Sequence, residues 1–182
     1  MPLTSRELCR RAAEKAAETT ARVRRALEGL DDEGLNRRTP SGEWSPAEVV
    51  EHLVVSHQIY LDLMKVVVSE RPVTGGDRPV RFSFIGRFLM KAAGPDGNAP
   101  APKAMVPRAG PYTREVVDRF EAQQKAMAEL ATACDDLDTS AVTYRNPIIK
   151  LFRMNVADGF GIYIEHVERH VRQIEERAAV KV

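Results

Sequence analysis

The segment WSPAEVVEHL, residues 44–53, begins the helix that decides the fold. Ser45 suits the N-cap, Pro46 the first helical position, and Glu48 the carboxylate that closes a capping box. His52 follows on the core-directed face of the same helix. Apolar side chains on that face carry the helix to about residue 69: Val49, Leu53, Ile59, Leu63 and Val67.

Three further segments have helical periodicity, and none of the chain alternates as a strand should. The first is rich in Ala, Glu, Arg and Lys, which are good helix formers, and is expected to end at Gly29 and Gly34. The last is capped by Asn155, with Asp158 three residues on. Residues 140–154, which include an Asn-Pro pair, are expected to form a loop. The predicted helices are 5–27, 113–137 and 155–178.

Residues 71–111 have a different character, because seven prolines and several glycines exclude a long helix there. Only residues 82–93 are expected to form a short amphipathic helix. A loop of this length in a compact domain is usually functional, for example as a lid or a pocket wall. Four helices with two short connections and one long crossover predict an all-α four-helix bundle, and we expect residues 1–182 to be a single domain.

The composition restricts the classes of function. The 182 residues include 27 basic and 26 acidic ones, so no overall field favours nucleic acid. The most apolar stretch, residues 49–68, is interrupted by charged and histidine side chains and predicts no membrane span. Cys9 and Cys134 have no CxxC spacing and are expected to be reduced thiols. A secretory signal needs an apolar run near its start, but the first residues here are charged, so the expected location is the cytoplasm.

Three of the four histidines can be brought together by helix geometry. His166 and His170 are four residues apart and project from one helix face. If the second and fourth helices are antiparallel, the rise of about 1.5 Å per residue places His52 at the same depth. His57 lies five residues after His52 and points well round the helix, so we leave it out of the site.

These histidines also have simpler interpretations: a surface pair on one helix, and a core histidine on another. Three meeting at one level would need partners for six ring nitrogens, and a metal ion supplies three of them. Three histidines with no fourth protein ligand predict an open site rather than a closed structural one. Imidazole donors suit several divalent ions, of which we expect zinc first and nickel next.

The segment 44–53, together with HVERHVRQI at residues 166–174, resembles the DinB/YfiT superfamily. The resemblance implies a four-helix bundle with up-down-down-up connectivity and a divalent metal ion on His52, His166 and His170. It matches Gln173 to a glutamine of the family pattern. Relatives include thiol S-transferases and a maleylpyruvate isomerase that use bacillithiol or mycothiol, which implies a low-molecular-weight thiol as co-substrate. Family members are often homodimers.

Helical spacing nominates neighbours for the metal. Glu48 and Gln173 are candidates to orient the histidines, although Glu48 is better explained as the capping-box acid. Tyr163 is a candidate acid or hydrogen-bond donor, and equally a core residue. Lys103 and Arg108, in the crossover, are candidates to meet an anionic substrate or cofactor. Trp44 is expected to be a packing anchor. The cluster of arginines at 22, 24 and 25 is interpreted as a solvent-exposed face.

These observations leave three functions open. The first is a metal-dependent S-transferase that activates a low-molecular-weight thiol for attack on an electrophile. The second is a hydrolase that uses metal-bound hydroxide, with a carboxylate such as Glu48 as base. The third is a non-catalytic, ligand-binding bundle in which the metal is structural. The expected partners are a small-molecule substrate and a second copy in a homodimer, with neither nucleic acid nor a membrane.

Overall fold

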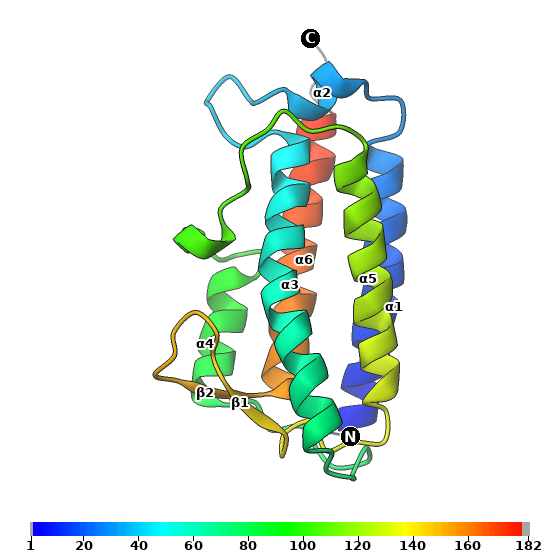
Figure 1. The fold of residues 1–182 in the computed structure, drawn as a ribbon, viewed down its shortest axis with the longest axis vertical. Coiled ribbons are helices and arrows are strands. Elements are labelled where there is room, and N and C mark those ends of the chain that lie inside the picture. Colours follow the sequence, from blue (N-terminus) through cyan, green and yellow to red (C-terminus); the bar gives the residue numbers. More distant parts are fainter. Residues whose placement is uncertain (1, 180–182) are drawn as a thin grey trace.

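A computed structural model describes residues 2–179, and most of them are helical. Four long helices lie side by side as a bundle (Figure 1). Following the chain, the first rises, the next two descend and the last rises again, which confirms the up-down-down-up connectivity. The long helices are α1 (Ser5–Ala26), α3 (Pro46–Glu70), α5 (Glu115–Ala133) and α6 (Val156–Ala178).

Each long helix packs against two others. α1 and α3 each contact both α5 and α6, so α1 lies diagonally across the bundle from α3. α3 and α6 run in opposite directions (Figure 1), which is the arrangement that brings His52 level with His166 and His170. α5 runs in the same direction as α3, so the chain must travel back along the bundle between them. Residues 71–114 make that return.

Side-chain caps fix where the helices begin. The Ser45 hydroxyl accepts from the Glu48 amide while the Glu48 carboxylate accepts from the Ser45 amide, which forms the predicted capping box of α3. Asn155 and Asp158 form the same box at α6. Each box satisfies two backbone groups that would otherwise lack partners. Thr4 caps α1 through the Glu7 amide.

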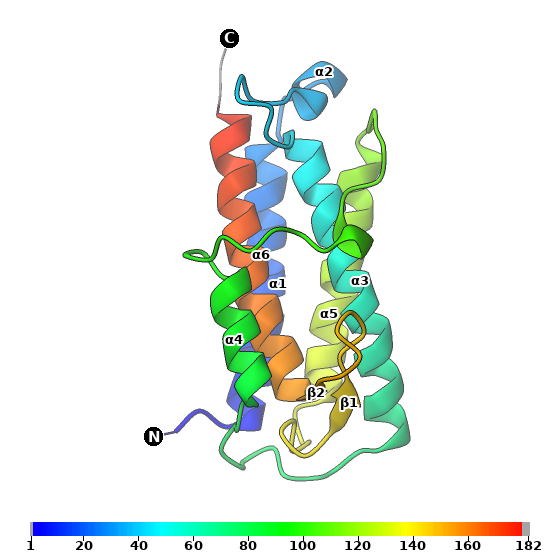
Figure 2. The same ribbon diagram turned by 90° about the vertical axis from the view of Figure 1, so that its left-hand side faces the viewer.

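The crossover covers one side of the bundle (Figure 2). Its short helix, α4 (Phe84–Ala93), is capped by Ser83 and packs against α6. The Ser83 amide donates to the Asp158 carboxylate over 2.8 Å, which joins the first turn of α4 to that of α6. After α4 the chain crosses α6 towards α3, where a 3-10 turn, η1 (Lys103–Met105), contacts α3.

Three local expectations were wrong. Residues 140–154 are not only a loop, because β1 (Thr143–Arg145) and β2 (Arg153–Asn155) form an antiparallel hairpin. Its strands have three residues each, too few for alternation to be recognised. Gly34 lies inside a short helix, α2 (Asp32–Asn36), which Asp31 caps. α5 ends four residues before 137, because residues 134–138 bond to the crossover instead. The Asp138 amide donates to the backbone oxygen of Val73, and the Gly75 amide donates to that of Asp136.

The apolar faces of the long helices meet in one continuous core that includes Phe120 and Phe160, both fully buried. Within residues 2–179, no helix combines the length and apolar character needed to cross a membrane.

Candidate metal centre

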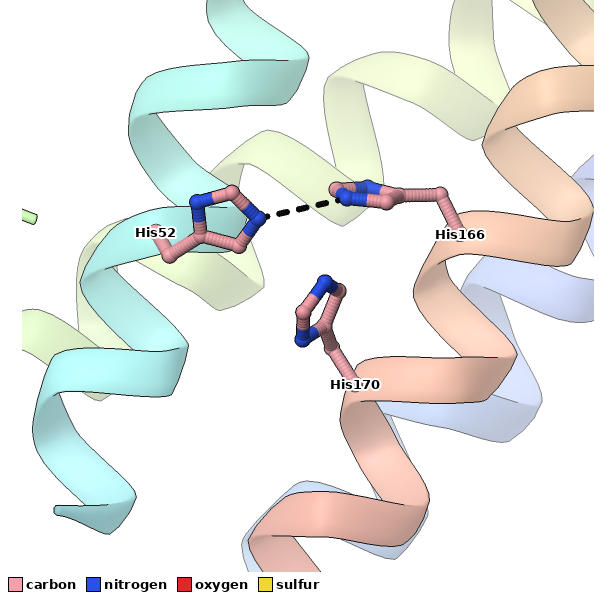
Figure 3. Close-up of side chains that lie close together, drawn as sticks. All are labelled: His52, His166 and His170. Carbon is pink, nitrogen blue, oxygen red and sulfur yellow. Dashed lines mark hydrogen bonds between the residues drawn. The ribbon is translucent and has the colours of Figure 1, made fainter. Parts of the chain in front are cut away.

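Three histidines from two helices meet on the inner side of the bundle. His52 extends from α3 towards His166 and His170, which lie one turn apart on α6 (Figure 3). The Nε2 atoms of His52 and His166 are 3.2 Å apart. One nitrogen from each of the three rings lies within 4.8 Å of the others. The antiparallel packing of α3 and α6 therefore gathers three imidazoles at one point.

Hydrogen bonds set the proton positions of two of these rings. The Nδ1 of His52 is 2.6 Å from the backbone oxygen of Met105, in the 3-10 turn of the crossover. The Nδ1 of His170 is 2.8 Å from the side-chain oxygen of Gln173. Both oxygens only accept, so both histidines carry their proton on Nδ1 and leave a lone pair on Nε2. This is the usual arrangement of a metal-binding histidine.

The third ring is held by His57, which the sequence analysis excludes from the site. Nε2 of His57 is 3.0 Å from Nδ1 of His166, and the His57 ring also packs edge-on against Tyr163 with centroids 5.1 Å apart. A five-residue offset turns a side chain by about 140° around a helix, so His57 cannot share a metal ion with His52. It can still reach a side chain on the neighbouring helix, and it supports His166 from the far side.

Burial keeps the cluster uncharged. It lowers the pKa of His170 to about 2 and that of His57 to about 3, and it also lowers the pKa of His52 and His166. Neutral imidazoles with free Nε2 lone pairs are the form that binds a divalent ion. The donor set therefore fits a divalent metal ion with three nitrogen ligands.

The three histidines line a cavity of about 510 Å³ between α3, α6 and the crossover. Trp44 lines it beside the metal centre, with its ring centroid 5.1 Å from that of His52. Among the described residues that line the cavity, none is Asp or Glu. Together with Trp44, the following apolar residues make up just over half of the lining: Met64, Leu89, Ala92, Ala93, Ala99, Pro100, Ala101, Pro102, Met105, Met127, Ile148, Ile149 and Ile162.

A family model, the DinB superfamily, matches residues 16–174, which include all three histidines. The chain belongs to the DinB superfamily. Its fold is similar to that of YfiT from Bacillus subtilis, described as a probable metal-dependent hydrolase with an unusual four-helix bundle topology. That likeness covers 93% of this chain and 85% of YfiT, with a TM-score of 0.60 at 18% sequence identity. No curated protein matches the chain.

Two of the candidate residues near the metal have other partners in this DinB-superfamily protein. Glu48 accepts from the Ser45 amide and forms an ion pair with Arg38, so it serves the helix start and does not line the cavity. Tyr163 does line the cavity, but its hydroxyl donates to the Gln124 side chain over 2.5 Å. Gln173, in contrast, orients His170 as expected.

The cationic candidates from the crossover do not reach the cavity. Lys103 is exposed, and Arg108 faces the buried carboxylate of Glu51 at 3.6 Å. The cavity is lined instead by Arg169 and Arg177 of α6. The spacing of these two arginines, three residues after His166 and seven after His170, was the signal in the sequence that would have found them.

Proposed function

We propose that this protein is a metal-dependent S-transferase in which a low-molecular-weight thiol binds at His52, His166 and His170. The observation that carries the proposal is a three-nitrogen site facing an apolar cavity without a carboxylate. Zinc is the ion we expect there, with nickel next. A divalent ion supplies one function when bound, which is to lower the pKa of a thiol and so provide a thiolate at neutral pH.

The protein's own residues favour sulfur chemistry at this place. Apolar walls exclude water, which competes with a thiol for the electrophile. Arg169 lies near enough to the triad to lower the pKa of His52, and its positive charge favours an anionic sulfur over a neutral one. Met105 and Gln173 hold the imidazoles in place, so the ligand set is organised before substrate arrives. We place the reaction in the cytoplasm, where thiols stay reduced.

The alternative enzymatic function is a hydrolase, as YfiT is described to be. Hydrolysis in this cavity would need a group to accept the proton of water, and the carboxylate considered from the sequence, Glu48, is engaged by Arg38 outside the cavity. The non-catalytic alternative requires the metal mainly for stability. Both alternatives share the metal site with our proposal and differ from it in the reaction.

Metal content and thiol turnover test the proposal together. Purified protein, stripped with a chelator and reloaded, should hold about one ion per chain. It should then consume a chromogenic electrophile such as a chloronitrobenzene with at least one bacterial thiol. His170→Ala should lose metal affinity by more than about 100-fold and lose turnover with it. Glu176→Ala, an exposed change on the same helix, is the matched control and should alter neither.

The outcomes separate the three functions. Less than about half an ion per chain after reloading would contradict the metal site itself. Cleavage of nitrophenyl esters without thiol, and no thiol turnover, would replace the transferase by a hydrolase. Metal binding that raises Tm with neither reaction would favour the non-catalytic bundle.

A further inference from the structure

A cationic side chain lines the cavity two helical turns away from the metal centre. Arg177 lies seven residues after His170 on α6, which returns it to the same helix face after two turns. It lines the same cavity as the histidines, and its side chain is 12% exposed. Seven residues of helix span about 10.5 Å, which sets the scale of the separation between the metal centre and the guanidinium.

The guanidinium of Arg177 is poorly compensated. Among residues 2–179, its buried Nη1 has no hydrogen-bond partner. The one carboxylate paired with it there is that of Glu43, 4.0 Å away on a side chain that is 60% exposed. Burial lowers the pKa of Arg177, which shows that its surroundings oppose the charge. Burying a cation without a close partner costs free energy, and a bound anion would reduce that cost.

The other described residues of the lining add no negative charge. Arg169 is the other charged side chain of the lining, and its Nη1 makes only a long contact, 3.5 Å, to the backbone oxygen of Ala92. A ligand entering this space meets two cations, a few neutral polar side chains and apolar walls. The combination selects against cations and favours an anion with an apolar body.

We propose that Arg177 binds a carboxylate group of the ligand whose sulfur occupies the histidine triad, an inference that rests on the proposed transferase function. The planar fork of a guanidinium matches a carboxylate with two parallel hydrogen bonds. The ligand is therefore a thiol acid that is extended between its two ends and apolar along its length. Binding of the carboxylate at Arg177 fixes the orientation of the ligand, so that its sulfur lies at the metal centre.

The test compares thiols that differ only at the far end. Cobalt-loaded protein is titrated with mercaptopropionate, mercaptohexanoate and mercaptooctanoate, and with the corresponding mercaptoalcohols, and the sulfur-to-cobalt charge-transfer absorption reports binding. A charged hydrogen-bonded pair should give the longer acids an advantage of about tenfold or more over their alcohols. Mercaptopropionate, too short to span the distance, should show little advantage.

Two variants assign the effect to Arg177. Arg177→Met should remove the preference for the acid and leave alcohol binding unchanged. Arg177→Lys should keep part of it, because the charge remains but the fork is lost. Arg172→Met removes a charge from an exposed position on the same helix and should leave the preference intact. If Arg177→Met does not fold, the wild-type comparison of acid with alcohol and Arg177→Lys still decide.

A metal-free experiment separates this inference from the function on which it rests. Octanoate, which has the carboxylate but no thiol, should raise the Tm of the metal-free wild-type protein more than that of Arg177→Lys. If no thiol binds to the cobalt-loaded protein, but octanoate raises the Tm of the metal-free wild type more than that of Arg177→Lys, the transferase function is contradicted and the anion site is supported. Equal affinities for acids and alcohols, or octanoate binding that Arg177→Lys leaves unchanged, would overturn the anion site.

Discussion

His57 is the residue whose replacement tests the metal centre most specifically. It touches no metal position itself, yet its Nε2 meets Nδ1 of His166 at 3.0 Å. Removing an outer partner of a metal-binding histidine typically weakens metal affinity by 10- to 100-fold. We therefore expect His57→Phe, which keeps an aromatic ring in the core, to weaken metal binding by roughly that factor, measured by competition with a chromogenic chelator.

Ser56→Ala is the control for this prediction. Ser56 lines the same cavity on the same helix, but its hydroxyl donates only to the backbone oxygen of Leu53. It should bind metal as the wild type does. An unchanged affinity in His57→Phe would mean that the contact with His166 does not support the ligand.

At the scale of residues, the sequence predicted the histidine positions that follow from helix geometry alone. The four-residue spacing of His166 and His170 and the depth of His52 follow from the rise of a helix, and the structure brings all three together. His57 was missed because its contact depends on where α6 lies beside α3. Arg177 shares the spacing of that helix face, but its burial depends on tertiary contacts, such as its pairing with Glu43, that spacing alone does not reveal.

At the scale of elements, the joint between α4 and α6 depends on a glycine. A side chain at Gly86 would overlap the Asp158 carboxylate, which also receives the Ser83 amide and completes the α6 capping box. Alanine is intrinsically better than glycine inside a helix by about 1 kcal/mol. We expect Gly86→Ala to destabilise the protein nevertheless, by about 1–3 kcal/mol, because the buried carboxylate must move. Denaturant unfolding measures the change.

Lys91→Ala provides the comparison in the same helix. Lys91 is exposed, so this change should alter the free energy of unfolding by less than about 0.5 kcal/mol. If Gly86→Ala were stabilising instead, helix propensity would outweigh the contact with Asp158, and α4 would not be anchored as described.

The helix starts were predictable because their signals are local. Ser45 with Glu48, and Asn155 with Asp158, lie within one turn of each other, and both boxes form. The end of α5 was not predictable, because it depends on bonds between residues 134–138 and the crossover. The hairpin at residues 143–155 was missed for a similar reason. Its two short strands are defined by their pairing with each other, and their sequences do not show the alternation of apolar and polar residues that predicts a strand.

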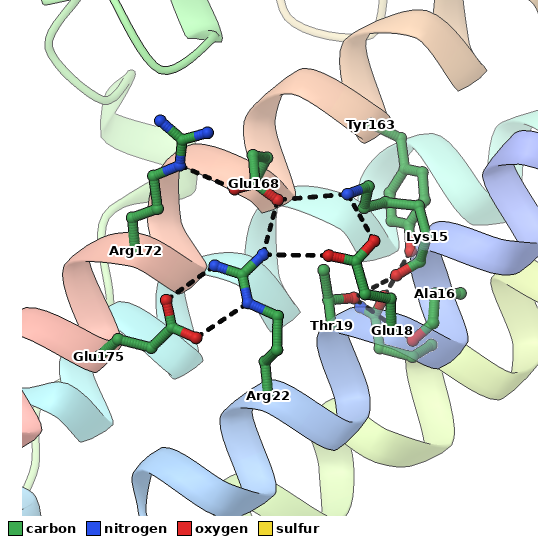
Figure 4. Close-up of polar contacts among 10 residues, drawn as sticks. Lys15, Ala16, Glu18, Thr19, Arg22, Tyr163, Glu168, Arg172 and Glu175 are labelled. Atoms are coloured by element: carbon green, nitrogen blue, oxygen red, sulfur yellow. Dashed lines mark hydrogen bonds and ion pairs between the residues drawn. The ribbon is translucent and has the colours of Figure 1, made fainter.

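At the scale of the whole molecule, a polar network joins α1 to α6 (Figure 4). Arg22 makes two hydrogen bonds to Glu175, of 2.8 and 2.7 Å, and a third to Glu168. Lys15 and Arg172 also bond to Glu168. The sequence predicts a solvent-exposed face here, but the Arg22 side chain is only 20% exposed. Its partner Glu175 lies 153 residues away along the chain, so the bundle itself creates the pair.

This network makes the stability of the bundle depend on pH. Burial alone would raise the pKa of Glu168, but hydrogen bonds from Arg172, Arg22 and Lys15 outweigh it and hold the pKa at about 2, below the ordinary 4.5. A carboxylate with a depressed folded-state pKa stabilises the fold above its unfolded pKa and loses that effect as pH falls towards the folded value. The contribution of Glu168, at most about 3 kcal/mol, should therefore disappear between pH 4.5 and about 2.

Glu168→Gln isolates this contribution, because the amide keeps the shape of the side chain and cannot titrate. Denaturant unfolding at a series of pH values should find the variant less stable than the wild type near neutrality, with the difference shrinking as the pH falls below 4.5. Glu14→Gln removes an exposed partner of Arg10 on α1 and should leave a nearly constant offset. A difference between Glu168→Gln and wild type that stays constant with pH would mean that shape and not charge makes the contact, and that α1 and α6 are joined by their apolar faces alone.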